Sequence, residues 1–369
     1  MPTISGIEIF KADIPFRFAF IHSRKARSAS ESIFVKVTLD NGIAGYGESM
    51  PRHYVTGQTQ DGVFSRLAEY APRLIGAALG DQDTSLAFIK GMEGIEGDGR
   101  CALEIALLDA AGKTFGKPLG ALLGTPAHTT FAYSGIVYGN STLGVLASTL
   151  MMKREGFRFL KIKVGLANDA ARVGACRAVY RDADLRIDAN GAWDATTALE
   201  AIGRLRRWRI SAVEQPTPKG DTSGLKAVSD ACPEPVIADE SLCTIADAVH
   251  LIKNRACDIF NVRLSKCGGI FRSLEIIKTA ADAGLGFQIG CHVGESGILS
   301  AAARQMAGIL EGTKYFEGSY GRIILTEDPI CEDITPYKGT APALSGPGLG
   351  VEVREAVLRT YSKDIRKVT

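Results

Sequence analysis

The sequence lacks the features that mark zinc-thiolate, secreted and membrane-spanning proteins. Its eight cysteines include no Cys-x-x-Cys pair, so we expect neither a zinc site nor a disulfide framework, but free thiols in a reducing cytosol. No uninterrupted apolar stretch reaches ~18 residues, and the N-terminus lacks the basic-then-apolar pattern of a secretion signal. We therefore expect a cytoplasmic protein with no spanning helix.

The sequence also has little excess of one charge sign over the other. The 43 basic and 41 acidic residues leave a net charge of +2, which gives no reason to expect a nucleic acid or a membrane surface as partner. The 369 residues, 46% of them hydrophobic, suit two domains or one barrel with an attachment.

Five polar residues in the middle of the chain each close, or directly follow, a short apolar run. They are Lys163, Asp188, Glu214, Asp239 and Lys266, at intervals of 25, 26, 25 and 27 residues. This interval suits one strand, one helix and two loops, so it predicts repeated βα units. Parallel strands joined by helices have their carboxyl ends at one edge, so these five residues should converge there.

The alternation of strands and helices extends on both sides of these five residues. Strands are predicted near 130–137, 158–164, 184–188, 211–214, 235–238, 258–262, 286–290 and 313–317. Helices are predicted near 143–155, 168–180, 194–208, 221–231, 243–254, 268–284 and 296–309. Eight parallel strands at this spacing favour a (β/α) barrel, and no Gly-x-Gly-x-x-Gly follows the first strand, which weakens the doubly wound alternative. Gly268-Gly269 indicates a tight turn, with a phosphate site as the alternative.

The first third of the chain has a different pattern. Strands are predicted at 3–14 and 32–38, with a hairpin turn at Asp40-Asn41-Gly42, and helices near 60–78, 82–93 and 99–116. This α+β pattern places a domain over residues 1–125, with the barrel over 126–326. The tail from 327 to 369 leaves the barrel pattern, and we expect it to pack on the N-terminal domain.

Two loops of the first third are candidates for substrate contact. Residues 16–32 show no clear period and carry Arg17, Arg24, Lys25 and Arg27. They predict either a solvated surface loop or a mobile lid over an anionic substrate. Residues 51–57, which include Tyr54, form the second candidate loop.

The three carboxylates predict a metal site. Asp188, Glu214 and Asp239 are hard oxygen ligands with no histidine or cysteine beside them, which favours Mg²⁺, with Mn²⁺ as substitute, over zinc. A single carboxylate at a strand end often only caps a helix, but three at one interval favour a shared ion. Mg²⁺ on a substrate carboxylate stabilises the dianion that forms when the adjacent carbon loses its proton.

The lysines predict the proton transfer. Lys161 and Lys163 are two residues apart in a strand, so both side chains point to the same side. A lysine next to another cation has a lowered proton affinity and can act as a base. Lys163 on the second strand and Lys266 after the sixth lie across the barrel, so a substrate between them would have a lysine on each face.

The sequence resembles the enolase superfamily and, within it, the muconate lactonizing enzyme subgroup, over nearly the whole chain. The matching motifs are Lys161-Ile162-Lys163, RIDANGAW, VEQP, IADES, NVRLSKCGG, GYGES, ALEIALLDAAGKTFGKPL and GPGLGVEV. The resemblance implies an α+β capping domain, completed by about 327–369, over a modified (β/α)₇β barrel with Mg²⁺. It also implies that Lys163 and Lys266 are the acid/base pair, that Asp188, Glu214 and Asp239 are the metal ligands, and that Lys161 is an electrostatic helper.

The resemblance leaves the reaction open, because the subgroup includes cycloisomerases, o-succinylbenzoate synthases, N-acylamino acid racemases and dipeptide epimerases. Dipeptide epimerases carry an Asp-x-Asp on the eighth strand that holds the substrate ammonium. The aligned residues 316–320 read FEGSY, which argues against an ordinary dipeptide epimerase, although Glu317 could replace part of that pair. We favour racemisation or epimerisation of an amino-acid-like carboxylate, a small-molecule substrate, and we expect the enzyme to be a homo-oligomer. The alternative is β-elimination by a cycloisomerase, dehydratase or o-succinylbenzoate synthase, and a less favoured one is a Schiff-base barrel lyase.

Seven residues are candidates for substrate binding: Arg24, Lys25, Tyr54, Asn190, His292, Glu295 and Glu317. His292 lies 26 residues after Lys266, which continues the interval. It is either a structural histidine at the barrel mouth, or a substrate contact or auxiliary acid. Glu295 corresponds to the glutamate that follows the family's seventh strand, in a turn that is one residue longer here.

Overall fold

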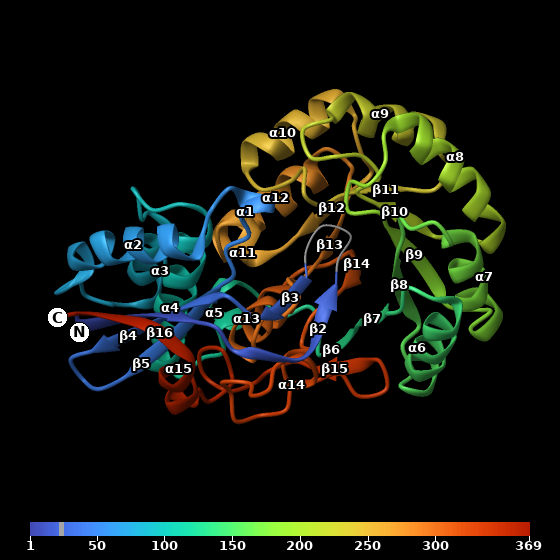
Figure 1. Cartoon of the computed structure of the whole chain (residues 1–369). Helices are drawn as coiled ribbons and strands as arrows, with labels where there is room; N and C mark the ends of the chain where they lie inside the picture. Colours follow the sequence, from blue (N-terminus) through green and yellow to red (C-terminus); the bar gives the residue numbers. More distant parts are fainter. Residues whose placement is uncertain (22–25) are drawn as a thin grey trace.

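The computed structural model describes residues 1–21 and 26–369, and its larger part is an eight-stranded parallel barrel (Figure 1). Sheet order follows chain order, and a register is paired between each strand and the next. The strands are β7 (Ser134–Val137), β8 (Phe159–Lys163), β9 (Asp184–Asp188), β10 (Ala212–Glu214), β11 (Val236–Ala238), β12 (Ile259–Val262), β13 (Gly286–Ile289) and β14 (Thr313–Phe316). The barrel is nearly closed, since the Tyr320 hydroxyl, from the segment that follows β14, donates to the Ser134 carbonyl of β7. The predicted barrel fold is confirmed.

Helices cover the outside of this barrel (Figure 1). They are α6 (Thr142–Arg154), α7 (Asp169–Val179), α8 (Ala195–Leu205) with η2 (Arg206–Trp208), α9 (Thr222–Ala231), α10 (Ile245–Asn254), α11 (Leu264–Cys267), α12 (Ile270–Asp282), α13 (Gly297–Ala307) and α14 (Gly321–Ile324). Helix α8 illustrates why the sequence forms these helices. Asp194 caps its first turn, and the buried residues Ala198, Ile202 and Leu205 recur at helical spacing. No helix of the described residues is long and apolar enough to cross a bilayer, and all eight cysteines are free thiols.

The smaller part is an antiparallel sheet packed against helices. Its strands run in the order β16 (Ser362–Val368), β1 (Ile4–Ala12), β4 (Ser32–Leu39) and β5 (Ala44–Ser49). The helices are α1 (His53–Thr56), α2 (Gln60–Tyr70), η1 (Ala71–Leu74), α3 (Gln82–Lys90), α4 (Gly97–Phe115), α5 (Leu119–Leu123) and α15 (Glu355–Tyr361). Strand β16 comes from the C-terminal tail and pairs with β1, so the two chain ends lie side by side (Figure 1). The exact domain limits stay a prediction.

Three details of the structure differ from the sequence-based expectation. The segment 16–32, predicted as an irregular loop, contains a hairpin of β2 (Pro15–Ile21) and β3 (Ala26–Ala29). The Arg24 and Lys25 positions lie outside the described residues. The predicted strand 130–137 is divided, because β6 (Thr130–Ala132) leaves the barrel and pairs with β15 (Thr340–Pro342). The segment 51–57 forms the short helix α1.

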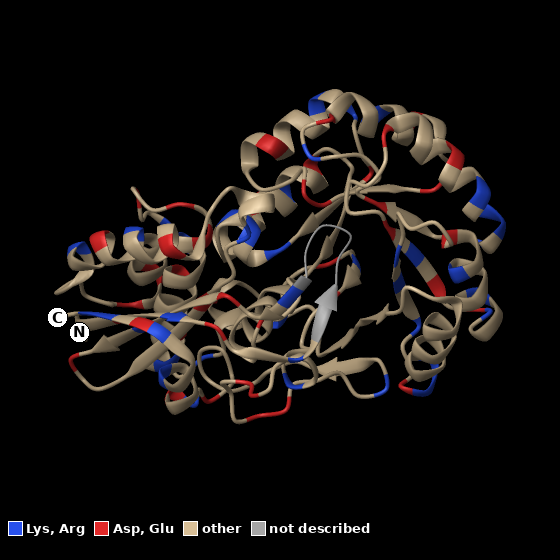
Figure 2. Cartoon of the chain, in the orientation of Figure 1, with Lys and Arg blue, Asp and Glu red and all other residues tan. Residues whose placement is uncertain are grey.

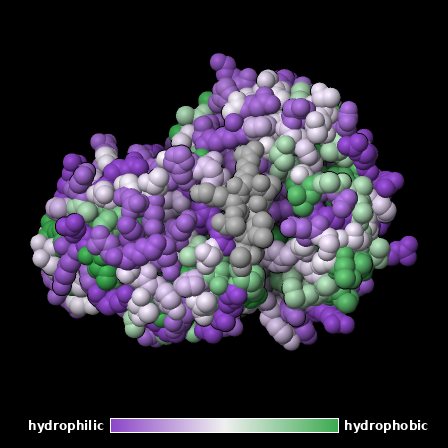
Figure 3. Space-filling model, viewed as in Figure 1, coloured by the Kyte–Doolittle hydropathy of each residue, from purple (hydrophilic) through white to green (hydrophobic). Residues whose placement is uncertain are grey.

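The surface of the smaller domain differs from the surface of helix α6 on the barrel. On the face seen in Figure 3, hydrophilic residues cover most of the smaller domain. Helix α6 on the barrel exposes several large apolar side chains, with Leu143 75% exposed.

Gly268 and Gly269 both have positive φ, at 84° and 103°, so the tight-turn interpretation of this pair is confirmed.

The capping sheet is fastened to the barrel by buried hydrogen bonds. Glu48 at the end of β5 accepts hydrogen bonds from the Ser296 and Leu299 amides at the start of α13. On the other side, the Ser265 hydroxyl of α11 donates to Asp98 of α4 and accepts from the Met50 amide. Carboxylates at a helix start satisfy its unpaired N–H groups. These contacts hold the sheet over the carboxyl ends of the barrel strands.

The GYGES motif is explained by the close packing of β5 on α4. A Cβ atom on Gly47 would lie 2.0 Å from the Ala102 carbonyl oxygen, and one on Gly45 would lie 2.1 Å from the Ala106 carbonyl oxygen. Only glycine allows the strand backbone to approach the helix this closely. The small residues of α4 and the glycines of β5 therefore form one interface.

We expect Gly47→Ala to destabilise the protein, because its methyl group overlaps the backbone of α4. Overpacking of this kind costs about 1–3 kcal/mol in free energy of unfolding, measurable by urea denaturation. The control is Gly6→Ala on β1, where a Cβ would meet no atom nearer than 3.6 Å. Equal midpoints for the two variants would contradict the packing explanation.

Candidate active site

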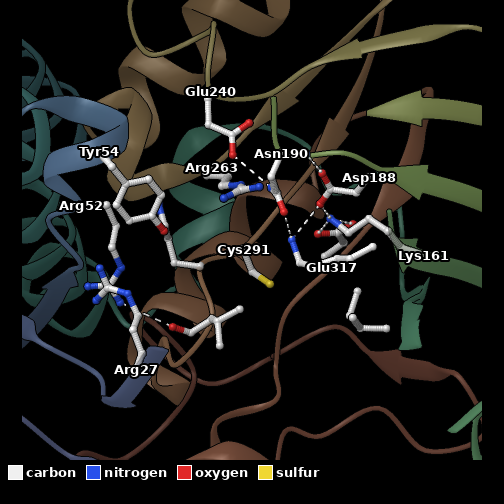
Figure 4. Close-up of a pocket in the computed structure, with 14 residues that line it drawn as sticks. Arg27, Arg52, Tyr54, Lys161, Asp188, Asn190, Glu240, Arg263, Cys291 and Glu317 are labelled. Atoms are coloured by element: carbon white, nitrogen blue, oxygen red, sulfur yellow. Dashed lines mark hydrogen bonds and ion pairs between the residues drawn. The ribbon is translucent and has the colours of Figure 1, made fainter. Parts of the chain in front are cut away.

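A cavity of about 200 Å³ lies between the capping hairpin and the carboxyl ends of the barrel strands (Figure 4). The barrel contributes Ile136, Lys161, Lys163, Asp188, Asn190, Glu240, Arg263, Cys291, His292, Val293 and Glu317, and the capping side contributes Arg27, Arg52 and Tyr54. Figure 2 shows basic and acidic residues close together on the strands at the centre of the barrel. The site therefore combines opposite charges in a largely enclosed space.

The three predicted metal ligands lie next to one another at the end of the barrel. Asp188 ends β9 and Glu214 ends β10, and the two are paired in register. Asp239 follows β11, and all three side chains are at most 1% exposed. Their position follows from the sequence, since each residue comes at the carboxyl end of consecutive parallel strands.

The lysines contact these carboxylates. The Lys161 ammonium lies 3.3 Å from a Glu214 oxygen, 3.7 Å from Asp188 and 2.8 Å from Glu317. The Lys163 ammonium lies 3.1 Å from Asp188 and also donates to the Asn190 side chain. Lys163 is 32% exposed, whereas Lys161 is almost fully buried, so Lys163 is the more accessible of the two lysines in the cavity wall.

Lys266 has a different environment. It lies in α11, just after β12, and its side chain is fully buried. Its ammonium donates to the Asp239 carboxylate at 2.9 Å, to the Asp239 carbonyl at 2.6 Å and to the Asn261 carbonyl at 2.9 Å. All three ammonium protons are therefore engaged.

The pKa values of Lys161 and Lys266 are raised, which is the opposite of the lowered proton affinity expected for a lysine beside another cation. Burial lowers the pKa of Lys266, but the Asp239 charge outweighs burial and the pKa is raised. For Lys161, the charges of Glu214 and Glu317 outweigh burial and also raise the pKa. The reason is that these ammonium groups face carboxylates and not one another.

The carboxylates crowd one another. Burial raises the pKa of Glu214 to about 7, and the nearby charges of Asp188 and Glu317 act in the same direction. Burial also raises the pKa of Glu240, followed by the charge of Asp239. The Glu240 Oε2 atom is buried and accepts no hydrogen bond. A further cation next to these carboxylates would therefore lower the electrostatic energy of the cluster.

The donor set fits a small divalent cation in chemistry. All the candidate ligands are carboxylate oxygens, which Mg²⁺ prefers. The Lys161 ammonium lies close to both Asp188 and Glu214, which shows that a single cation can reach two of them. In the described structure, no three His, Cys, Asp or Glu side chains are grouped as a metal site. Each of the three carboxylates instead contacts an ammonium or guanidinium group. Ligation of one ion therefore requires them to exchange these contacts for the metal.

Two arginines in the barrel were not identified from the sequence. Arg263, within the NVRLSK motif, contacts Asp239 and lies 3.6 Å from Glu214. Arg186 lies beneath the site, donates to Glu317 at 2.6 Å and stacks 3.8 Å from the centre of the Tyr315 ring. The available signal for Arg186 was its spacing, because a residue two positions before Asp188 in a strand points to the same side.

The structure brings together most of the predicted substrate contacts. Tyr54, Asn190, His292 and Glu317 all line the cavity. Glu317 is already engaged, because Lys161 and Arg186 both contact its carboxylate. Glu295 is buried outside this lining and accepts hydrogen bonds from the His292 amide and the Ser300 hydroxyl. The other two candidates fall at positions 24 and 25, outside the described residues.

The capping side adds two neighbouring guanidinium groups. Arg52 is 2% exposed and Arg27 is 8% exposed, and Arg27 lies 5.7 Å from the centre of the Tyr54 ring. Burial lowers the pKa of Arg52 to about 10, and the charge of Arg27 adds to this effect. Their carboxylate partner, Glu31, is about half exposed. This end of the cavity therefore suits an anionic group.

Comparison with known proteins gives the family. The mandelate racemase/muconate lactonizing enzyme N-terminal domain matches residues 5–124, and the enolase C-terminal domain-like family matches residues 145–357. A hydrophobic dipeptide epimerase of Enterococcus faecalis is 32% identical over 82% of this chain and 86% of its own length.

Two solved structures cover the whole chain. The N-succinyl Arg/Lys racemase of Bacillus cereus is similar with a TM-score of 0.92 and 27% identity, over 100% of both chains. A dipeptide epimerase of Cytophaga hutchinsonii, complexed with Mg and the dipeptide D-Ala-L-Val, has a TM-score of 0.88 and 28% identity, again over 100% of both chains. Together with the family matches, these similarities show that the chain is an isomerase of the enolase superfamily and belongs to the mandelate racemase/muconate lactonizing enzyme family.

Proposed function

We propose that this enzyme racemises or epimerises an N-acylated amino acid by moving the proton on the carbon next to the carboxylate, with Mg²⁺ bound. The placement of Lys163 and Lys266 carries the proposal. One ends β8 and the other follows β12, four strands apart in an eight-stranded barrel, so they lie on opposite sides of the carboxylate cluster. A carbon between them could lose its proton to one lysine and regain it from the other.

Each residue of the cluster then has a role. Asp188, Glu214 and Asp239 would hold Mg²⁺, with Mn²⁺ as a substitute. When bound, the metal supplies positive charge for the dianion of the substrate carboxylate. Lys163 faces the cavity and exchanges the proton, and its contacts with Asp188 and Asn190 fix the position of the ammonium. The cytoplasmic location and the homo-oligomeric state remain part of the proposal.

The acylated nitrogen is supported by the environment of Glu317. A dipeptide has a free ammonium group that needs an unpaired carboxylate near the end of the eighth strand. Glu317 is the acidic residue there, and it is bound by Lys161 and Arg186. An amide nitrogen needs no such partner, and the name of the similar B. cereus racemase supports an N-succinyl group.

The guanidinium groups of Arg27 and Arg52 support a second negative charge on the acyl chain. Arg27 and Arg52 are buried cations that line the cavity, whereas Glu31 beside them is half exposed and Asp98, which also acts on Arg52, lies outside the lining. Arginine binds carboxylates with paired hydrogen bonds. We therefore infer an acyl group that ends in a carboxylate, as a succinyl group does.

Cycloisomerisation by β-elimination is the second candidate, and the environment of Lys266 favours it. This ammonium is fully buried and holds three oxygen acceptors, which suits a group that only stabilises charge. A Schiff-base lyase is less favoured, because it gives no role to the three buried carboxylates beside the lysines.

The metal assignment predicts that Glu214→Gln weakens Mg²⁺ binding and abolishes turnover, because the central ligand loses its charge. Calorimetry with Mg²⁺ measures the affinity, and we expect a loss of at least about tenfold, since even a residue that only orients a metal ligand contributes about that much. The matched control is Glu311→Gln, an exposed residue outside the site, which should bind as the wild type does. Unchanged affinity in Glu214→Gln would refute the assignment.

The two-lysine proposal predicts a division of labour that deuterium exchange can detect. In D₂O, Lys163→Ala should still exchange the α-proton of the enantiomer that faces Lys266, and Lys266→Ala should exchange only the other enantiomer. Neither variant should complete the inversion, since loss of a general base costs ~10²–10⁴-fold. Lys226→Ala on the surface serves as the control. If Lys266→Ala exchanges neither enantiomer, or exchange always accompanies loss of a β-substituent, elimination replaces racemisation.

The anionic acyl chain predicts a substrate-dependent effect of Arg27→Gln. KM for an N-succinyl amino acid should rise about 10- to 100-fold, because a charged hydrogen bond contributes about 1.5–3 kcal/mol. KM for the corresponding N-acetyl amino acid, which lacks the distal carboxylate, should change little. An equal loss for both substrates would mean that Arg27 serves only the fold.

A further inference from the structure

A second cavity of about 190 Å³ adjoins the first. The two cavities share the residues Ile136, Lys163, Asn190, Cys291, His292 and Val293. They therefore meet at Lys163, the lysine that faces the substrate carbon in the proposed function. The first cavity includes Arg27 and Arg52 in its lining, whereas the second does not.

The second cavity has a largely apolar wall. Its own residues include Val137, Tyr138, Val164, Leu166, Tyr320 and Ile324. Of the charged side chains in its described lining, Arg172 is paired with Asp169 and bonds to the Gly139 carbonyl. Glu295 accepts two hydrogen bonds, and burial raises its pKa to about 8. Among the residues described, Glu295 is the one carboxylate of this lining, while Lys163 and Arg172 are its two cations, so a basic side chain would meet more positive than negative charge there.

The junction of the cavities carries an unused hydrogen-bonding group. His292 is 4% exposed, and neither of its ring nitrogens has a hydrogen-bond partner. Burial, followed by the charge of Arg263, holds its pKa well below the usual range, so the ring is neutral, with one donor and one acceptor. A buried polar group of this kind needs a partner, and the amide beside the substrate's α-carbon offers both an N–H and a carbonyl.

The α-carbon of an N-acyl amino acid bears three groups besides its proton: the carboxylate, the acylamino group and the side chain. The structure offers three directions around Lys163: the carboxylate cluster, the arginine-lined cavity and the apolar cavity. We infer that the apolar cavity binds the amino-acid side chain and selects bulky apolar side chains, with His292 contacting the neighbouring amide. This inference rests on the proposed function. It also separates this enzyme from the similar racemase, which is named for arginine and lysine.

A substrate series tests the inference. We expect kcat/KM for N-succinyl-leucine and N-succinyl-phenylalanine to exceed that for N-succinyl-alanine and N-succinyl-lysine by about tenfold or more, since each buried methylene contributes about 1–3 kcal/mol. Leu166→Asp introduces a carboxylate into the apolar cavity, so the lysine-to-leucine ratio should rise at least about tenfold. Leu143→Asp, on an exposed leucine of α6, is the matched control and should leave the ratio unchanged.

A second variant repeats the test with a narrower cavity, and a binding measurement tests the preference without turnover. Leu166→Trp narrows the cavity, so it should reduce kcat/KM for the phenylalanine substrate more than for the alanine substrate. Calorimetry of the same N-succinyl amino acids with the Mg²⁺-loaded protein measures the preference directly. Turnover without any side-chain preference, and without a shift in Leu166→Asp, would overturn this inference and leave the reaction intact. A side-chain preference in binding without racemisation would overturn the proposed reaction and support the subsite.

Discussion

The rest of the structure depends on the balance of buried charge at the mouth of the barrel. Asp188, Glu214 and Asp239 are withdrawn from water, and an isolated buried carboxylate would cost several kcal/mol. Lys161, Lys163, Lys266 and Arg263 compensate this charge at contact distance, while Arg186 does the same for Glu317. Removing one partner would leave an uncompensated charge, which explains why so many ionic groups occur together. Metal binding, as proposed, would require these carboxylates to exchange contacts with protein cations for contacts with the metal ion.

The two parts of the fold contribute different things to the site. The barrel holds the carboxylates and lysines on strand ends, where the sheet hydrogen bonds fix their positions. The capping side supplies Arg27, Arg52 and Tyr54 from a hairpin and a short helix. Buried contacts of Glu48 and Asp98 with α13 and α11 join the two parts. In the proposed function, the barrel strand ends carry the proton transfer, and residues of both the cap and the barrel loops contact the substrate.

Much of this arrangement could be predicted from the sequence. The interval near 25 residues located the barrel strands to within one or two residues, apart from the first, because hydrophobic runs and βα connections have few alternatives in a parallel barrel. The same interval placed the three carboxylates on adjacent strand ends. The hairpin at β2 and β3 was missed, because a short edge hairpin has too few residues for a clear period. Arg186 and Arg263 were also missed, since a single basic residue inside a strand or motif does not show which partner it faces.

The sequence by itself determined the order of the strands, the face on which the polar residues converge and the membership of the family, since these follow from local patterns and motifs. Only the tertiary structure decided the partners of each charge. Lys161 and Lys266 face carboxylates and not one another, so their pKa values are raised and not lowered. Glu317 is occupied by Lys161 and Arg186, and His292 is left with both ring nitrogens free. The physical reason is that electrostatic energies depend on distances and burial across the barrel, which no local sequence pattern encodes.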